Sequence, residues 1–231
     1  ITDRFYPGME PSANIELRYY HGEAILALLR LHALEPQETW LAPAERGARY
    51  LITVRDAGVP EERQIHDHWL LYALNELHRA RPDPVYLSHA RRIARTIVAS
   101  QNRSAYPPER LGAYGRGAES TPAATRTEGL FAAYALMRDF GPGEELARIR
   151  GAIHLGVGFQ LKTQLRPEQA MYLPDPLRAL GAFHRSLADY EVRIDYVQHN
   201  LSGVLGSYRL FAQPGVLPGV SPSSRAVADG K

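Results

Sequence analysis

Apolar residues recur at helical spacing along most of the chain, and this periodicity limits the possible folds more than any other feature. Ile25, Leu28 and Leu29 form one such stripe, because positions three and four apart share one face of a helix. No segment carries the strict alternation of apolar and polar residues that is typical of a half-buried strand. Proline and glycine separate the periodic segments, and the polar stretch 181–196 is expected to be a loop. The sequence therefore predicts an all-α fold.

The predicted helices come in pairs, and the first helix of each pair repeats one apolar pattern. The copies read AILALL at 24–29, WLLYAL at 69–74, GLFAAY at 129–134 and, more weakly, LSGVLG at 201–206. The second helices are rich in alanine and arginine, as in AERGARYLI and SHARRIARTIV. Helical hairpins stacked side by side form either an open solenoid or a closed toroid, in which each hairpin buries its apolar face against the next.

Four strings carry a resemblance to a known group of proteins: YYHGEAILALLRL, DHWLLYALNELHRA, TRTEGLFAAYAL and YEVRIDYVQHNLSGVL. From Arg18 to Phe211 the chain resembles the bacterial α/α-toroid proteins related to six-hairpin glycosidases and glucuronyl epimerases. This resemblance implies a ring of inner helices enclosed by outer helices, with a polar pocket at one end. It also implies activity on sugars or uronic acids, and a periplasmic or secreted location. The zinc ligands of lanthionine cyclases and the Asp-rich motif of terpene cyclases are missing from the sequence.

Rings of this kind close with more hairpins than this chain supplies, so we expect an incomplete ring. Residues 1–212 are then the C-terminal part of a larger toroid domain, completed by hairpins upstream of Ile1 or by a partner subunit. Residues 213–231 are rich in proline, glycine and serine, and we expect a flexible tail there.

Composition excludes several other classes. Apolar residues make up 45% and charged residues 23%, which is typical of a globular domain and not of a disordered chain. No apolar run approaches the roughly 18 residues of a membrane span, and the absence of cysteine excludes thiolate metal sites and cysteine nucleophiles. The net charge is +2 without a basic stripe, so no nucleic-acid partner is expected.

One register position of the repeat predicts a functional site. The residue just before each apolar stripe is polar in all four copies: Glu23, His68, Glu128 and Asn200. In a toroid these helix starts lie at the same mouth of the ring. Unpaired N–H groups and positive dipole ends of the helices favour an anionic ligand there, such as a uronate carboxylate.

We expect the catalytic groups to come from Glu128, His199, Asp195 and His68, where Asp195 and His199 stand four residues apart on one predicted helix. The expected substrate-binding residues are Glu23, Asp67, Trp69, Arg126, Tyr196 and Asn200. Hydrolysis of a glycosidic bond needs two carboxyl groups, whereas epimerisation or elimination needs a base and a group that holds the substrate's carboxylate. The sequence leaves these reactions open, and it suggests no cofactor.

Each candidate also has a structural interpretation. Thr125 and Glu128 fit a capping box, Asp195 with Gln198 fits another, and Asp67 fits a helix N-cap. Trp69 fits the core. The pair His66-x-His68 lacks a third metal ligand, so no metal is expected. The alternative function is therefore a non-catalytic toroid module that binds or assembles with a larger protein or complex.

Overall fold

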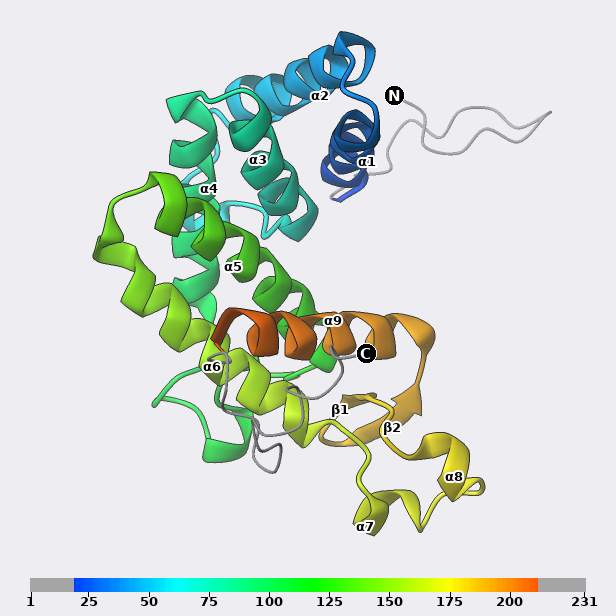
Figure 1. Cartoon of the computed structure of the whole chain (residues 1–231). Coiled ribbons are helices and arrows are strands. Elements are labelled where there is room, and N and C mark those ends of the chain that lie inside the picture. The colour runs from blue at the N-terminus through cyan, green and yellow to red at the C-terminus, as the bar shows by residue number, and fades with distance from the viewer. Residues whose placement is uncertain (1–18, 212–231) are drawn as a thin grey trace, which may run out of the picture.

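The computed structural model describes residues 19–211, which form a stacked array of α-helical hairpins (Figure 1). The long helices are α1 (Tyr20–Leu34), α2 (Glu38–Tyr50), α3 (His68–Ala80), α4 (Pro84–Ser100), α5 (Ser120–Phe140), α6 (Leu146–Lys162) and α9 (Ile194–Phe211). Two one-turn helices, α7 (Pro167–Ala170) and α8 (Pro176–Ala179), lie between α6 and a small hairpin of strands β1 (His184–Ser186) and β2 (Asp189–Val192). No helix within residues 19–211 is long and apolar enough to cross a membrane.

The helices are arranged in two layers. Helices α1, α3, α5 and α9 form the inner row and pack against one another in chain order, while α2, α4 and α6 each pack against two neighbouring helices of this row. Figure 1 shows the successive hairpins following one another down the molecule. The prediction of a mostly helical chain built from stacked hairpins is therefore confirmed for the described residues, and the closed toroid stays a prediction.

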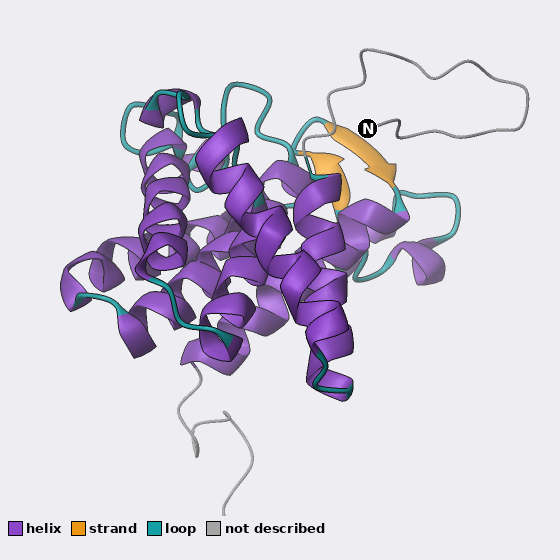
Figure 2. Cartoon of the chain, turned by 90° about the horizontal axis from the view of Figure 1, so that it is seen from above, coloured by secondary structure: helices purple, strands orange, loops and turns teal. Residues whose placement is uncertain are grey.

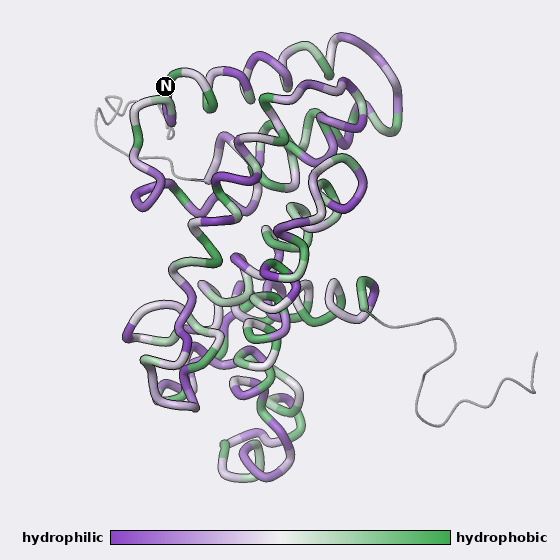
Figure 3. The backbone as a smooth tube through the Cα atoms, turned by 90° about the vertical axis from the view of Figure 1, so that its left-hand side faces the viewer, coloured by the Kyte–Doolittle hydropathy of each residue, from purple (hydrophilic) through white to green (hydrophobic). Residues whose placement is uncertain are grey.

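The core fills the space between the two layers. Helix α3 contributes Leu70, Leu71, Leu74 and Leu77, all of which are fully buried. They recur at the spacing that places apolar side chains on one broad face of a helix. Figure 3 shows hydrophobic and hydrophilic stretches following one another along the helices, as expected for helices with one apolar face. Burial of each such side chain contributes about 1.5–3 kcal/mol, so the core is what holds the layers together.

Two glycines bring the inner helices close together at the end that carries the polar residues. A Cβ atom at Gly22 of α1 would lie 2.6 Å from the backbone nitrogen of Leu70. A Cβ atom at Gly129 of α5 would lie 3.1 Å from the Cα atom of His68. Both distances are shorter than normal packing allows, so these positions need glycine. As a result α1, α3 and α5 converge around His68.

Three local features differ from the predictions. The expected loop at 181–196 contains the antiparallel pair β1 and β2, whose three and four residues are too few for an alternating pattern to stand out. Figure 2 shows this hairpin at one edge of the helices. Helix α5 begins at Ser120, five residues before the expected start, and Ser120, Ala123 and Ala124 of this additional segment are buried. The end of α2 continues into a π-helical turn at Leu51–Arg55. The predicted tail at 213–231 lies outside the described residues.

Candidate functional site

Three side chains from three inner helices meet at one end of the array. His68 is the first residue of α3, Glu128 lies in the third turn of α5, and His199 lies in the second turn of α9. The Nδ1 atom of His199 donates a hydrogen bond of 2.9 Å to Oε2 of Glu128. One nitrogen or oxygen from each of the three residues lies within 4.8 Å of the other two. The sequence predicted that these residues share one site, and the structure brings them together.

His68 is buried and unusually short of partners. It is 4% exposed, and neither of its ring nitrogens has a hydrogen-bond partner among the described residues. Burial, together with the positive charges of His199 when protonated and of Arg126, lowers the pKa of His68 to about 3. The imidazole is therefore neutral at physiological pH. The ring of His68 packs against the rings of Tyr19, Trp69 and His199, with centroid distances of 5.8, 4.8 and 5.6 Å.

Arg126 stands two residues before Glu128 and provides the site's positive charge. Its Nε atom donates a hydrogen bond of 2.8 Å to Nδ1 of His66, and its guanidinium lies 4.6 Å from the ring centre of Tyr114. Within residues 19–211 it forms no ion pair with a carboxylate. Burial lowers the pKa of His66 to about 4, with a further contribution from the charge of Arg126, so His66 stays neutral and leaves that charge uncompensated.

A hollow of about 340 Å³ opens beside Arg126. It is lined by Tyr19, Glu62, Arg63, Gln64, Ile65, His66 and Arg126. Tyr19 also packs against His68, so this hollow borders the cluster of His68, Glu128 and His199. The lining carries two arginines, Arg63 and Arg126, and one glutamate, Glu62, so its net charge is positive. This charge favours an anionic ligand, and the volume is enough for a sugar.

The predicted roles of Asp67, Trp69 and Glu23 have different outcomes. Asp67 caps α3, since its Oδ1 atom accepts a hydrogen bond of 2.9 Å from the Leu70 amide, and the capping interpretation is confirmed. Burial raises the pKa of Asp67 to about 6 against the opposing effects of Leu70 and Arg55. Trp69 is half-buried between the core and the ring of His199. Glu23 is exposed on α1 and takes no part in the described contacts of the cluster.

The capping box predicted at Thr125 and Glu128 is wrong. Because α5 begins at Ser120, both residues lie inside the helix, and the Thr125 hydroxyl donates instead to the carbonyl of Thr121. This correction matters for function, since the buried Glu128 carboxylate is not occupied with helix N–H groups.

The start of α9 also differs from expectation. Asp195 lies next to Arg193, with its Oδ1 atom 3.1 Å from Nε, and does not orient His199, whose partner is Glu128. The hydroxyl of Tyr196 accepts a hydrogen bond of 2.9 Å from Arg185. The amide of buried Asn200 donates to the carbonyl of Tyr196. Asp195, Tyr196 and Asn200 therefore support the β-hairpin and the first turns of α9, next to the cluster.

A second buried network escaped the sequence analysis. The carboxylate of Asp56 accepts hydrogen bonds from Arg55 at 2.6 and 2.9 Å, from Gln64 at 2.8 Å and from Nε2 of His89 at 3.0 Å. Arg55 ends the π-helical turn, Asp56 and Gln64 follow it, and His89 lies in α4. No local spacing links Asp56 to Gln64 or His89. Asp56 has a full set of partners and faces no free ligand position.

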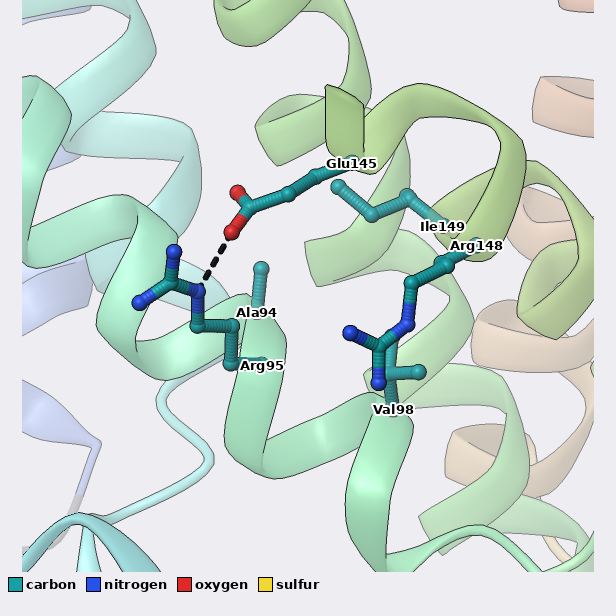
Figure 4. Close-up of a pocket in the computed structure, with 6 residues that line it drawn as sticks. All are labelled: Ala94, Arg95, Val98, Glu145, Arg148 and Ile149. Carbon is teal, nitrogen blue, oxygen red and sulfur yellow. Dashed lines mark hydrogen bonds and ion pairs between the residues drawn. The ribbon is translucent and has the colours of Figure 1, made fainter. Parts of the chain in front are cut away.

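The hollow drawn in Figure 4 lies between α4 and the start of α6. It is lined by Ala94, Arg95, Val98, Glu145, Arg148 and Ile149. Its volume is about 10 Å³, which is no more than the room for one water molecule. Glu145 forms ion pairs there with Arg95 and Arg91, so these charges hold α4 against α6.

Comparisons with protein-family models, with curated proteins and with solved structures find no match for this chain. Its function is therefore inferred from the geometry and chemistry of the site itself.

Proposed function

We propose that this protein is an α/α-toroid enzyme that acts on a sugar or a uronic-acid-containing glycan by acid/base chemistry. The observation that carries the proposal is the hydrogen-bonded pair of Glu128 and His199 near Arg126, which has no acidic partner within residues 19–211. A carboxylate that orients an imidazole is a common way to prepare a general base or acid. An arginine without an acidic partner next to such a pair is suited to hold the carboxylate of a substrate.

Among the possible reactions, the geometry favours proton abstraction next to the substrate's carboxylate over two-carboxylate hydrolysis. Glu128 is the one carboxylate of the cluster within residues 19–211. Asp67 is fully buried and is occupied as a helix cap, so it is not a second catalytic acid. We therefore propose epimerisation or elimination, in which His199 or Glu128 removes the proton from the carbon next to the uronate carboxylate. Arg126 then stabilises the negative charge that builds up on that carboxylate.

The test uses exchange of the substrate's own hydrogen, because both reactions begin with the same proton abstraction. Uronic-acid-containing oligosaccharides are incubated with the full chain in heavy water, and incorporation of deuterium at C5 or formation of an unsaturated product is followed by NMR. Glu128→Gln and His199→Asn should abolish the reaction, whereas Arg126→Met should both weaken substrate binding and slow the exchange. The exposed Glu144→Gln is the matched control and should behave as wild type. Absence of exchange, elimination and binding with all uronate substrates would contradict the proposal.

One observation favours the alternative of an assembly module. Helix α9 exposes Ile194, Leu201, Leu205 and Tyr208. Helix α1 exposes Tyr20, Leu31 and Leu34. Within each helix these spacings place the side chains on one face. Because α1 and α9 are the first and last inner helices of the described array, each lacks the second inner neighbour that α3 and α5 have. Further hairpins, or a partner subunit of the same kind, would bury both apolar faces.

This second candidate is tested by the state of the chain in solution. Light scattering coupled to size exclusion should reveal concentration-dependent association of the isolated chain, and Leu205→Glu should abolish it. Ala147→Glu, at an exposed position in the first turn of α6, is the matched control. A monomer at all concentrations, with no change in Leu205→Glu, would speak against an assembly role for this face.

A further inference from the structure

The acid/base chemistry proposed for Glu128 and His199 gives no role to the third residue of the cluster, His68. His68 is buried at the meeting point of α1, α3 and α5, and both of its ring nitrogens lack hydrogen-bond partners among the described residues. A buried polar group without a partner costs about 1–3 kcal/mol, so such a group in a well-packed position calls for an explanation. The neighbours of the ring are Tyr19, Trp69 and His199, and within residues 19–211 none of them forms a hydrogen bond with His68 that would explain why position 68 needs an imidazole.

The two other polar residues of the cluster complete a ligand set. Two imidazoles and one carboxylate are the side chains that zinc uses in three-ligand sites with an open position. The same set binds other divalent transition metals. Metal–ligand bonds of about 2.0–2.2 Å at tetrahedral angles place the donor atoms about 3.4 Å apart. Here Nδ1 of His199 and Oε2 of Glu128 are 2.9 Å apart, and a donor atom of each of the three residues lies within 4.8 Å of the others. Coordination through these two atoms would release the Nδ1 proton to solvent and would replace their hydrogen bond by two metal bonds.

We propose that His68, Glu128 and His199 bind one divalent transition-metal ion, with Zn²⁺ as the best match to the donor set. The proposal goes beyond the acid/base function, because it concerns the occupancy of the cluster and holds whether or not the protein acts on a glycan. The three ligands come from α3, α5 and α9, so the ion would also join three inner helices.

The surroundings fit an ion that keeps one position open. Glu128 supplies a single negative charge, so a bound Zn²⁺ would leave the site with a net positive charge. That charge would add to the charge of Arg126 and strengthen the attraction of an anionic ligand in the adjoining hollow. A water molecule in the open position would ionise near neutral pH and would serve as the base of the metal-bound cluster, because Glu128 and His199 would then be engaged as ligands.

The decisive experiment measures metal binding without any substrate. The full chain, free of an affinity tag and stripped with a chelator, is titrated with Zn²⁺ by calorimetry and with Co²⁺ by visible absorption. One equivalent should bind, with a Co²⁺ spectrum typical of a four- or five-coordinate site, and the melting temperature should rise with metal concentration. His68→Asn, Glu128→Gln and His199→Asn should each weaken binding at least tenfold.

Two control variants make the result specific. His154→Asn changes an exposed histidine of α6 and should leave the affinity unchanged. His66→Asn should also leave it within about twofold, because His66 is bonded to Arg126 and not to the cluster. His68→Asn is the most informative ligand variant, since it removes no hydrogen bond and should fold normally, as checked by circular dichroism.

The proposal is overturned if none of Zn²⁺, Co²⁺, Mn²⁺ or Ni²⁺ binds at one equivalent, or if His68→Asn binds as tightly as wild type. Loss of binding in His66→Asn with retention in His199→Asn would instead point to the His66-x-His68 pair and would also overturn it. Neither result bears on the deuterium-exchange test, so failure of the metal site and failure of the acid/base function are distinguishable.

Discussion

Residues 19–211 contain two buried pairs of a carboxylate and a histidine, and they are built in opposite ways. Asp56 and His89 are joined by a bond of 3.0 Å, and Glu128 and His199 by a bond of 2.9 Å. Around Asp56 the further donors are Arg55 and Gln64, so every part of the carboxylate has a partner. Around Glu128, within residues 19–211, the hydrogen bond from His199 stands alone.

The difference separates a structural network from a candidate site. A buried charge that is fully paired stabilises the arrangement of the segments around it, here the end of α2, the loop that follows and α4. The Glu128 carboxylate has acceptor positions that no donor within residues 19–211 fills, and the neighbouring His68 ring has no partner there. Such buried groups lower stability, and they are retained where a ligand or a reaction uses them. Substitutions in the two clusters should therefore differ in their effect on the free energy of unfolding.

The largest effect is expected from Asp56→Asn. The substitution removes the closer of the two carboxylates that pair with Arg55, whose side chain is 18% exposed, and leaves it only Asp67, whose Oδ2 atom lies 3.6 Å from Nη1. Removing one member of a buried ion pair costs about 3–5 kcal/mol. The free energy of unfolding, measured by urea denaturation, should fall by about 3 kcal/mol or more. Asp139→Asn is the control, because its pairs with Arg79 and Arg138 are largely exposed and are expected to contribute less than about 1 kcal/mol. Equal losses of unfolding free energy in Asp56→Asn and Asp139→Asn would contradict the structural role of the Asp56 network.

The same network predicts how stability depends on pH. Burial alone would raise the pKa of Asp56, but the hydrogen bonds from Arg55, His89 and Gln64 outweigh it and hold that pKa well below its usual value of 3.8. The folded protein therefore keeps the carboxylate ionised at pH values where the unfolded chain takes up a proton. Its contribution is complete above the unfolded pKa and is lost as the pH falls toward the folded pKa. Wild type should lose stability below about pH 4 more steeply than Asp56→Asn, and parallel curves would contradict this.

Replacing each histidine by leucine compares the two clusters most directly. His89→Leu removes a hydrogen bond to a charged group, which costs about 1.5–3 kcal/mol. His68→Leu removes no hydrogen bond and eliminates two unpaired buried nitrogens, so it should be neutral or should stabilise by up to about 1 kcal/mol. Urea denaturation of both variants in metal-free buffer gives the comparison. A larger loss in His68→Leu than in His89→Leu would mean that His68 is structural.

The sequence predicted the first cluster and missed the second for a physical reason. His68 and Glu128 occupy the same position of a repeated helix, and His199 stands one residue earlier in its copy, so helical periodicity alone places them at one end of the array. Asp56 and His89 are separated by 33 residues and belong to a loop and a helix that share no repeat. Only the packing of α4 against the segment after α2 brings them together.

Local start signals were less informative than the repeat. Asp67 was correctly predicted as a cap, because a short polar side chain stands directly before the apolar run of α3. Thr125 with Glu128 has the same appearance, but α5 had already begun at Ser120. Ala123 and Ala124 are small and buried. Small side chains give no clear apolar periodicity from which the start of α5 at Ser120 could be recognised. Capping motifs inside an alanine-rich segment therefore indicate a helix start only weakly.

The smallest effect on stability is expected from Glu128→Gln. Glutamine keeps the length and shape of the side chain, and its amide can still bond His199, so the single hydrogen bond of Glu128 is retained in neutral form. Removing the charge also relieves the cost of burying a carboxylate that is only 5% exposed. The weaker, neutral hydrogen bond lowers stability, whereas removal of the buried charge raises it. The free energy of unfolding in metal-free buffer should therefore change by less than about 1 kcal/mol.

Glu145→Gln is the matched control for this last prediction. Glu145 is a second buried glutamate, 9% exposed, but it pairs with Arg91 and Arg95, and its substitution should cost more than that of Glu128. The functional readouts should reverse the order: Glu128→Gln should lose deuterium exchange and metal binding, while Glu145→Gln keeps both. If Glu128→Gln unfolds more easily than Glu145→Gln and still exchanges deuterium, Glu128 holds α5 to α9 as a structural residue. The assembly interpretation of the array would then be the stronger one.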